Sequence, residues 1–227
     1  MRLSAVAFSL ALLCAGEACA QGDILFGAGV RSRPEFDGFS ERETDLVPVL
    51  RYYGEPWFLR TTQGMLEGGA RLRIGEGTVI GAQLAYEQGP RDRDPGASLG
   101  AHAEWDGRLG PMPLDLLLRV RQHLDTERGL QVDLRLTAGV YQGHGLLAGV
   151  FTQLTFANQD YYRAYYDVRQ SGVLYGSVGA LASFDLARHW VLVGSVERRR
   201  LTDHAMRSPL AEQRSASYAT LGLAYRF

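Results

Sequence analysis

Residues 130–141 read Leu-Gln-Val-Asp-Leu-Arg-Leu-Thr-Ala-Gly-Val-Tyr, and they show most clearly which kind of fold the chain adopts. Every second residue is apolar, and most of the residues between are polar or charged. Successive side chains of a β-strand point to opposite faces, so this strand has one aliphatic and one polar face. A tilted strand needs about ten residues to cross a bilayer, whereas strands of soluble proteins usually have about five or six. The stretch therefore predicts a membrane-spanning strand.

The same alternation recurs along most of the chain. It is clear in residues 66–74, 99–106 and 114–121, and weaker in further segments. Together they make about twelve strands, an even number, as bacterial single-chain barrels have. The sequence therefore predicts an all-β transmembrane protein, an antiparallel up-and-down barrel. The further segments are Ile24–Arg31, Leu46–Tyr53, Trp57–Thr62, Thr78–Glu87, Leu146–Phe156, Val173–Phe184, Trp190–Arg199 and Ser217–Phe227.

The links between these segments are alternately short and long. The short ones are rich in Gly, Pro and Asp, as tight turns are. In outer-membrane barrels short turns face the periplasm and long loops face outward, so we expect both termini in the periplasm. The short turns are residues 53–56, 75–77, 107–113, 142–145 and 185–189, and the long links are 32–45, 88–97, 122–129, 157–172 and 200–216.

Three features depart from this regular pattern. The segment Trp57–Thr62 is short, and Leu46–Tyr53 contains Pro48, which cannot donate a hydrogen bond to a neighbouring strand. The link Thr62–Met65 is also short, although it falls on the side of the long links. The two strand features leave the strand count open by about two.

Aromatic residues mark both ends of the strands. Trp57, Trp105 and Trp190 fall beside short turns, and Tyr86 and Phe156 fall at the opposite strand ends. This placement predicts the two aromatic girdles that flank the apolar band of a membrane barrel.

The last alternating segment ends in Phe227, with Tyr225 on the same face. A terminal strand of this kind resembles the signal that the outer-membrane assembly machinery recognises. We therefore expect Tyr225 and Phe227 to act as an assembly signal and the assembly machinery to be a partner.

The N-terminal 20 residues predict a cleaved signal peptide. Arg2 precedes an apolar run at residues 3–15, which is too short to span a bilayer as a helix, and Ala18-Cys19-Ala20 matches a cleavage site. We expect cleavage after Ala20, which leaves residues 21–227 as one barrel domain in the cell outer membrane of a Gram-negative-type bacterium. The mature chain then contains no cysteine, because both cysteines lie in the removed segment.

The charges of the chain nearly balance, with a formal net charge of −1. This balance gives no electrostatic reason to expect a nucleic-acid partner. We expect outer-membrane lipid and lipopolysaccharide around the barrel, and no cofactor.

Three stretches resemble the MipA/OmpV family of outer-membrane proteins, and the terminal Tyr-Arg-Phe also fits it. The resemblance covers nearly all of the mature chain. At residues 165–168 the chain reads Tyr-Tyr-Asp-Val, which departs from the family's more usual Tyr-Phe-Gly-Val. The stretches are Gly27-Ala28-Gly29 followed by Pro34–Gly38, then Val47-Pro48-Val49 with Tyr52-Tyr53 and Trp57-Phe58, then Asn158–Gly172.

The resemblance implies a non-enzymatic scaffold or surface protein. The family's founding member is described as bridging a murein-cleaving lytic transglycosylase and a murein-synthesising penicillin-binding protein, so these enzymes are the expected partners. Other members are described as surface antigens or adhesins, and some are linked to antibiotic entry or resistance. The resemblance implies no catalytic residue.

The residues themselves predict neither a catalytic nor a metal site. A hydrolase triad needs a serine within reach of a histidine held by a third group, and Asp203-His204 near Ser208 is the closest local match. The one local group of potential metal ligands is His102, Glu104 and Asp106, which we interpret as part of a charged lumen wall. A lipid-modifying enzyme using His102 or His204 remains the alternative.

The polar faces of the strands predict a densely charged lumen. Buried charges must be paired or hydrated. The charges therefore form either an ion-pair network that fills the lumen, which we favour, or the Arg-rich lining of a small-solute channel biased toward anions. The candidate residues are Arg51, Glu67, Arg71, Arg73, His102, Glu104, Asp115, Arg119, Arg121, Asp133, Arg135, Glu197, Arg199 and Arg226.

The long link at residues 157–172 is rich in tyrosine, a residue that favours interfaces. Two interpretations stay open, an external contact surface and a loop that folds inward as a plug or packs on the rim. The candidate contact residues are Tyr161, Tyr162, Tyr165 and Tyr166.

Overall fold

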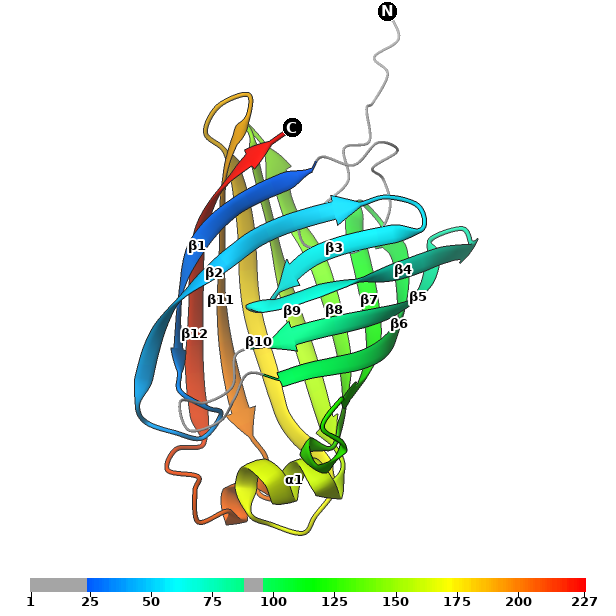
Figure 1. Ribbon diagram of the computed structural model, residues 1–227. Coiled ribbons are helices and arrows are strands. Elements are labelled where there is room, and N and C mark those ends of the chain that lie inside the picture. Colours follow the sequence, from blue (N-terminus) through cyan, green and yellow to red (C-terminus); the bar gives the residue numbers. More distant parts are fainter. Residues whose placement is uncertain (1–23, 88–95) are drawn as a thin grey trace, which may run out of the picture.

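The computed structural model describes residues 24–87 and 96–227, which form a closed barrel of antiparallel strands (Figure 1). Each strand pairs with its neighbours in the sequence, and β1 closes the barrel against β12. The all-β barrel and its twelve strands are confirmed. The strands are β1 Leu25–Pro34, β2 Arg42–Tyr53, β3 Trp57–Thr62, β4 Met65–Gly75, β5 Thr78–Glu87, β6 Gly96–Leu109, β7 Met112–His123, β8 Leu130–Gly143, β9 Leu146–Ala157, β10 Gly172–Asp185, β11 Trp190–Leu201 and β12 Ser215–Arg226.

Two parts of the sequence predictions fall outside the described residues. These are the signal peptide at residues 1–20 and most of the link at 88–97. Several strands are longer than their alternating segments. For example, β6 has 14 residues and runs past both ends of the segment 99–106. Beyond the apolar band the outward residues need not be apolar, so the alternation fades before the hydrogen bonding does.

The barrel has two different ends (Figure 1). At one, here called the turn end, lie the start of β1, the end of β12 and the turns that join β2 to β3, β4 to β5, β6 to β7, β8 to β9 and β10 to β11. At the other, the loop end, lie the helix α1 (Gln159–Tyr166) and the short 3-10 turns η1 (Thr126–Arg128) and η2 (Ala205–Arg207). No helix among the described residues is long and apolar enough to cross a membrane. That the turn end faces the periplasm stays a prediction.

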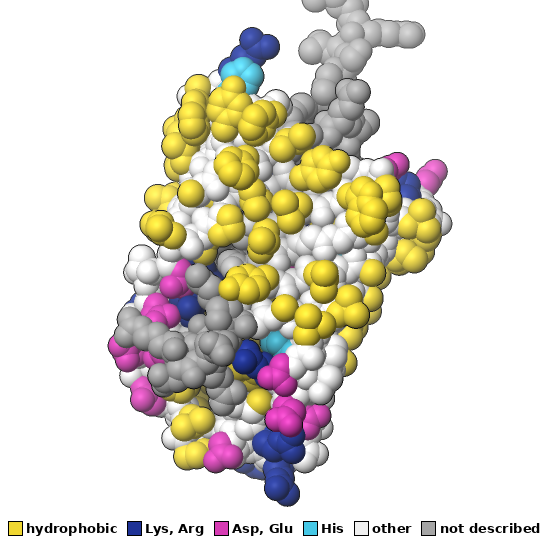
Figure 2. Space-filling model, viewed as in Figure 1, with side chains coloured by type: hydrophobic (Ala, Val, Ile, Leu, Met, Phe, Trp, Pro, Cys, Tyr) yellow, Lys and Arg dark blue, Asp and Glu magenta, His cyan; other side chains and the backbone are white. Residues whose placement is uncertain are grey.

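The barrel is apolar outside and polar inside. Its outer wall exposes large apolar side chains such as Leu46, Leu72 and Leu221. On the face drawn in Figure 2, hydrophobic side chains are spread over the wall, and many charged side chains gather toward the loop end. Trp57, Trp105 and Trp190 are also exposed, near the turn-end termini of β3, β6 and β11. This inverted distribution suits a barrel surrounded by lipid.

The seam between β2 and β3 is the weakest in the barrel wall. Only three residue pairs join these strands among the described residues, whereas β1 and β2 pair along ten positions. The β3–β4 hairpin turns at Gln63 and Gly64, both with positive φ, as a two-residue type I′ turn requires. The three irregular features of the sequence, Pro48, the short strand and the short link, thus meet at one place. The joined pairs are Arg51–Arg60, Tyr52–Leu59 and Tyr53–Phe58.

Candidate functional site: the charged lumen

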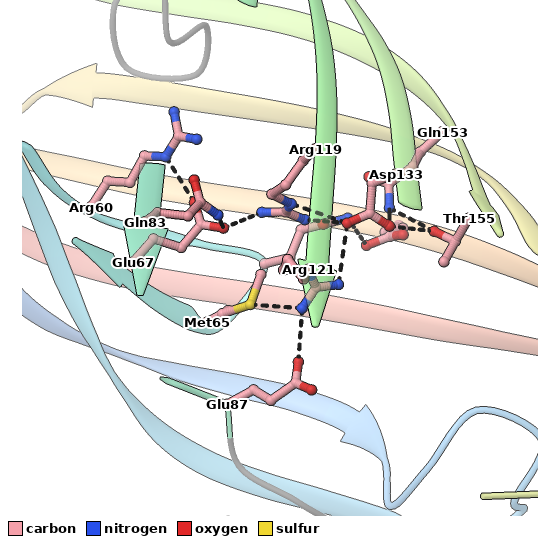
Figure 3. Close-up of polar contacts among 12 residues, drawn as sticks. Arg60, Met65, Glu67, Gln83, Glu87, Arg119, Arg121, Asp133, Gln153 and Thr155 are labelled. Carbon is pink, nitrogen blue, oxygen red and sulfur yellow. Dashed lines mark hydrogen bonds and ion pairs between the residues drawn. The ribbon is translucent and has the colours of Figure 1, made fainter. Parts of the chain in front are cut away.

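A network of buried ion pairs begins at Arg60 on β3 (Figure 3). Its Nε lies 2.8 Å from Oε2 of Glu67 on β4, and its Nη1 lies 2.6 Å from Oε1 of Glu104 on β6. All three side chains are almost fully buried. Because inward positions on neighbouring strands are set by the register, residues far apart in the sequence meet in the lumen.

The network continues through two arginines of β7. Arg119 donates to Glu67 and lies 2.8 Å from Asp133 on β8. Arg121 lies 3.1 Å from Asp133 and 3.2 Å from Glu87. The dashed lines in Figure 3 trace this path from Glu67 through Arg119 to Asp133.

Neutral side chains complete the hydrogen bonds of the two central carboxylates. Gln83 donates to Glu67 at 3.0 Å, and Thr155 donates to Asp133 at 2.7 Å. A buried charge is tolerated only when its partners are in place, because an isolated one costs several kcal/mol of desolvation. The ion pairs and these hydrogen bonds together link strands β3 to β9 across the lumen.

A second charged cluster lies at the loop end. Arg199 on β11 contacts Glu197 at 2.8 Å and Asp37, from the link between β1 and β2, at 3.0 Å. Its guanidinium also lies over the ring of Tyr218, 4.1 Å from the centroid, and Tyr218 donates to Asp37. The link that follows β1 is thereby held inside the mouth of the barrel.

The wall opposite the ion-pair network is apolar toward the turn end. Leu25, Val191 and Ala224 form a buried cluster, with Val49 and Val193 packed against it. Strands β1, β2, β11 and β12 supply these residues. The lumen thus has one charged and one apolar side.

Two cavities lie next to each other in the lumen. The first, of about 120 Å³, lies under α1 at the loop end, and its lining includes Phe36, Tyr161 and Tyr165. The second, of about 160 Å³, lies closer to the turn end, and its lining includes Leu25, Val49 and Val193. The residues that line both cavities are Arg31, Gln63, Gly64 and Tyr218.

The tyrosine-rich link forms α1, which packs into the loop end. Asn158 caps the helix by accepting a hydrogen bond from the backbone N–H of Tyr161 at 3.0 Å. Tyr162 donates to the carbonyl of Val173 at 2.8 Å, and Tyr166 donates to that of Asp37 at 3.1 Å. Burial raises the pKa of the Tyr161, Tyr162 and Tyr166 hydroxyls above the usual range.

This packing corrects the prediction of an exposed contact surface. Tyr161, Tyr162, Tyr165 and Tyr166 are all buried, Tyr162 completely. The physical reason is spacing: residues three and four apart share one helix face, so a single face of α1 brings the tyrosines onto the barrel rim. The alternative, a loop packed on the rim, describes the structure.

The histidines do not assemble a hydrolase site in the described residues. His204 contacts Gln170 at 2.7 Å, while Asp203 pairs with Arg214 and Ser208 donates to the carbonyl of Tyr166. His102 lies edge-on to the ring of Phe58, with Nε2 4.0 Å from Glu104. No group of three potential metal ligands converges within residues 24–87 and 96–227.

The structure places the predicted lumen residues in three groups. Ten are buried, Arg199 is half-buried in the loop-end cluster, and the others lie toward the turn end. There Arg71 and Arg226 are half-buried, and Arg73 is exposed, which corrects its placement in a buried network; it lies where β4 reaches the rim. The ten buried residues are Arg51, Glu67, His102, Glu104, Asp115, Arg119, Arg121, Asp133, Arg135 and Glu197.

Sequence reasoning missed several residues of the lumen. Arg60 joins two carboxylates, yet it stands in the short segment whose alternation is the least clear. Arg60 stands two residues after Phe58, which points inward. Because every second side chain of a strand lies on the same face, this spacing could have placed Arg60 in the lumen. Arg31 was missed at the end of its segment, and Gln83, Gln153 and Thr155 were missed because they are uncharged.

The predicted assembly signal lies at the turn end. Tyr225 packs against Trp190 and His189, with ring centroids 5.4 and 5.3 Å apart, and Phe227 is 71% exposed. Recognition by the assembly machinery stays a prediction.

Comparison with known proteins agrees with this fold. The family described as "MltA-interacting protein MipA" matches residues 26–227. No curated protein matches the chain in sequence at a significant level. Among solved structures, an outer membrane channel from Pseudomonas putida F1 superposes with a TM-score of 0.59 at 13% identity, covering 93% of this chain and 97% of the channel. The NanC porin superposes with a TM-score of 0.55 at 11% identity, covering 90% of this chain and 100% of the porin.

Proposed function

The chain belongs to the MipA family of MltA-interacting proteins, and we propose that this outer-membrane β-barrel is a non-enzymatic scaffold for murein enzymes. In this proposal residues 1–20 are removed as a signal peptide and the turn end faces the periplasm. A lytic transglycosylase of the MltA kind binds there, and a murein-synthesising penicillin-binding protein joins it.

The observation that supports this proposal best is the buried ion-pair network. Arg60, Arg119 and Arg121 pair with carboxylates inside the barrel and so tie its strands together. A rigid barrel with compact turns holds a docking surface in a fixed orientation, which lowers the entropic cost of binding. The proposed role is non-enzymatic because of the family and because His204, Asp203 and Ser208 each contact a different group.

The turn end carries exposed apolar side chains that could serve as the docking surface. Leu109 is the last residue of β6 and is 66% exposed. Leu186 lies in the turn between β10 and β11 and is 53% exposed. Exposed apolar side chains at the end of a barrel, outside its lipid-facing wall, are candidates for protein contacts.

Site-specific photo-crosslinking in intact envelopes tests the proposal. A crosslinker at Leu186, on the turn end, should capture a lytic transglycosylase or a penicillin-binding protein. The matched control is Leu210, a leucine of similar exposure on the loop end, which should capture neither. Recovery of no murein enzyme from Leu186, or equal recovery from both positions, would contradict the scaffold.

A small-solute channel is the second candidate. It is supported by the two cavities, which share four lining residues and so lie next to each other along the lumen. Their common lining includes Arg31, whose positive charge favours anions. Planar-bilayer recording of the refolded chain should then show discrete, anion-biased conductance, and a silent bilayer would exclude this candidate.

A further inference from the structure

The cavity near the turn end reaches the side of the barrel. Besides inward residues, its lining includes Pro48 and Leu50 of β2 and residues 61–64 of the β3–β4 hairpin. Pro48 and Leu50 alternate with the inward Val47 and Val49, so they belong to the outer face of β2. Outer-face residues can line a lumen cavity only where the wall is parted, and β2 pairs with β3 only from Arg51 to Tyr53, so the two strands are not paired at Pro48 and Leu50.

The inner wall of this cavity is largely apolar. Val47 and Val49 of β2, Leu181 of β10, Val193 of β11 and Phe151 of β9 line it. Its volume of about 160 Å³ is close to that of an engineered apolar cavity, about 150 Å³, which binds benzene. The space therefore suits an apolar body of about six or seven carbon atoms.

The charges that line the cavity are mainly positive. Arg31, Arg51 and Arg135 line it, and Glu197 is the one carboxylate among its lining residues in the described chain. Glu197 is already engaged, since it accepts hydrogen bonds from Arg199 at 2.8 Å and from Gln63 at 3.1 Å. More positive than negative side chains thus line the cavity, beside an apolar wall.

Arg31 is the arginine best placed to receive an anion. It lies where the two cavities meet, and its guanidinium lies 5.3 Å from the ring centroid of Tyr218. Among the residues that the structure describes, no carboxylate forms an ion pair with it, unlike Arg33, which contacts both Glu43 and Asp45. A planar guanidinium can bind a carboxylate through two parallel hydrogen bonds.

We propose that this cavity is a binding site for a small amphipathic monocarboxylate, which reaches it through the parted seam between β2 and β3. The carboxylate binds Arg31, and the apolar body lies against Val47, Val49 and Val193. The site goes beyond the scaffold role and does not depend on it, because it lies inside the barrel rather than at the turn end.

Calorimetric titration of the refolded full chain in detergent tests the site, with benzoate as the probe. Two compounds with the same ring are the controls, neutral benzyl alcohol and cationic benzylammonium. Benzoate should bind best and benzylammonium should not bind. Equal binding of benzoate and benzyl alcohol, or no binding of benzoate, would overturn the proposal.

Two substitutions locate the bound molecule. Arg31→Gln should weaken benzoate binding by about tenfold or more, as expected for the loss of a charge-assisted hydrogen bond, and should leave benzyl alcohol unaffected. Val47→Phe should weaken both, because it fills the apolar part. The matched control is Arg42→Gln, on the exposed end of β2 and outside the cavity lining, which should change neither affinity.

Folding of each variant is checked by the β-sheet circular dichroism of the refolded chain. Should Arg31→Gln fail to fold, the conservative Arg31→Lys replaces it; this variant should retain part of the benzoate affinity, because the charge remains without the bidentate geometry. Unchanged benzoate affinity in a folded Arg31 variant would contradict the site. Since binding is measured without a partner enzyme or a bilayer, its failure is distinct from failure of the scaffold or the channel.

Discussion

Arg119 on β7 pairs across the lumen with Glu67 on β4, and both side chains are at most 1% exposed. Two strands, β5 and β6, separate their own strands in the wall. The pair therefore ties together parts of the barrel that share no backbone hydrogen bonds.

Arg119→Ala should destabilise the barrel by about 3–5 kcal/mol, because it leaves Glu67 and Asp133 partly uncompensated in a buried site. Urea unfolding of the refolded protein measures the change. The control is Arg163→Ala, which removes an exposed pair with Asp160 on α1 and should cost less than about 1 kcal/mol. Similar losses for both variants would show that the lumen pairs are no stronger than surface pairs.

Asn158→Ala should loosen α1 locally. The Asn158 side chain accepts hydrogen bonds from the backbone N–H groups of Tyr161 and Leu130, so it fastens the helix to β8. Loss of an N-cap of this type costs about 0.5–2 kcal/mol. Hydrogen exchange of residues 159–166 should accelerate, while exchange in the barrel strands stays unchanged. Unchanged exchange in the helix would mean that the tyrosines alone hold it.

The tyrosines of α1 should resist ionisation in the folded protein. Burial raises the pKa of Tyr161 and Tyr166 well above the usual value of about 10. The stability that this burial contributes is fully present below the unfolded value and is lost as the pH rises toward the folded values. Tyrosinate absorbance should therefore appear at a higher pH in the folded than in the denatured chain. Coincident titrations would contradict the burial of these hydroxyls.

Phe227→Ala should lower the amount of assembled barrel in cells but hardly change the stability of the refolded protein. Phe227 is 71% exposed, so its removal loses little burial within the fold. The control is Phe26→Ala, another outward phenylalanine on the adjacent strand, 63% exposed. Equal effects of both substitutions on assembly, measured by envelope fractionation, would argue against a terminal recognition signal.

Much of the fold follows from the sequence because the signals are local. The alternation in residues 130–141 needs only neighbouring residues to establish a strand and its two faces, and β8 spans Leu130–Gly143. The same parity places Glu67, Arg119 and Asp133 inside, where the structure has them. Turn composition likewise separated the short connections from the long ones.

The tertiary structure alone decided which of these groups meet. Arg60 and Glu104 are 44 residues apart, and their contact depends on the register of four strands and on the curvature of the closed wall. Local sequence patterns contain neither the strand register nor the curvature of the wall. The inward packing of α1 and the parted seam between β2 and β3 also depend on tertiary structure. Both are set by where the ends of strands that are distant in the sequence lie in the closed barrel. The barrel and its two faces thus follow from local sequence patterns, whereas its ion pairs, its cavities and the site of Arg31 follow from closure of the barrel.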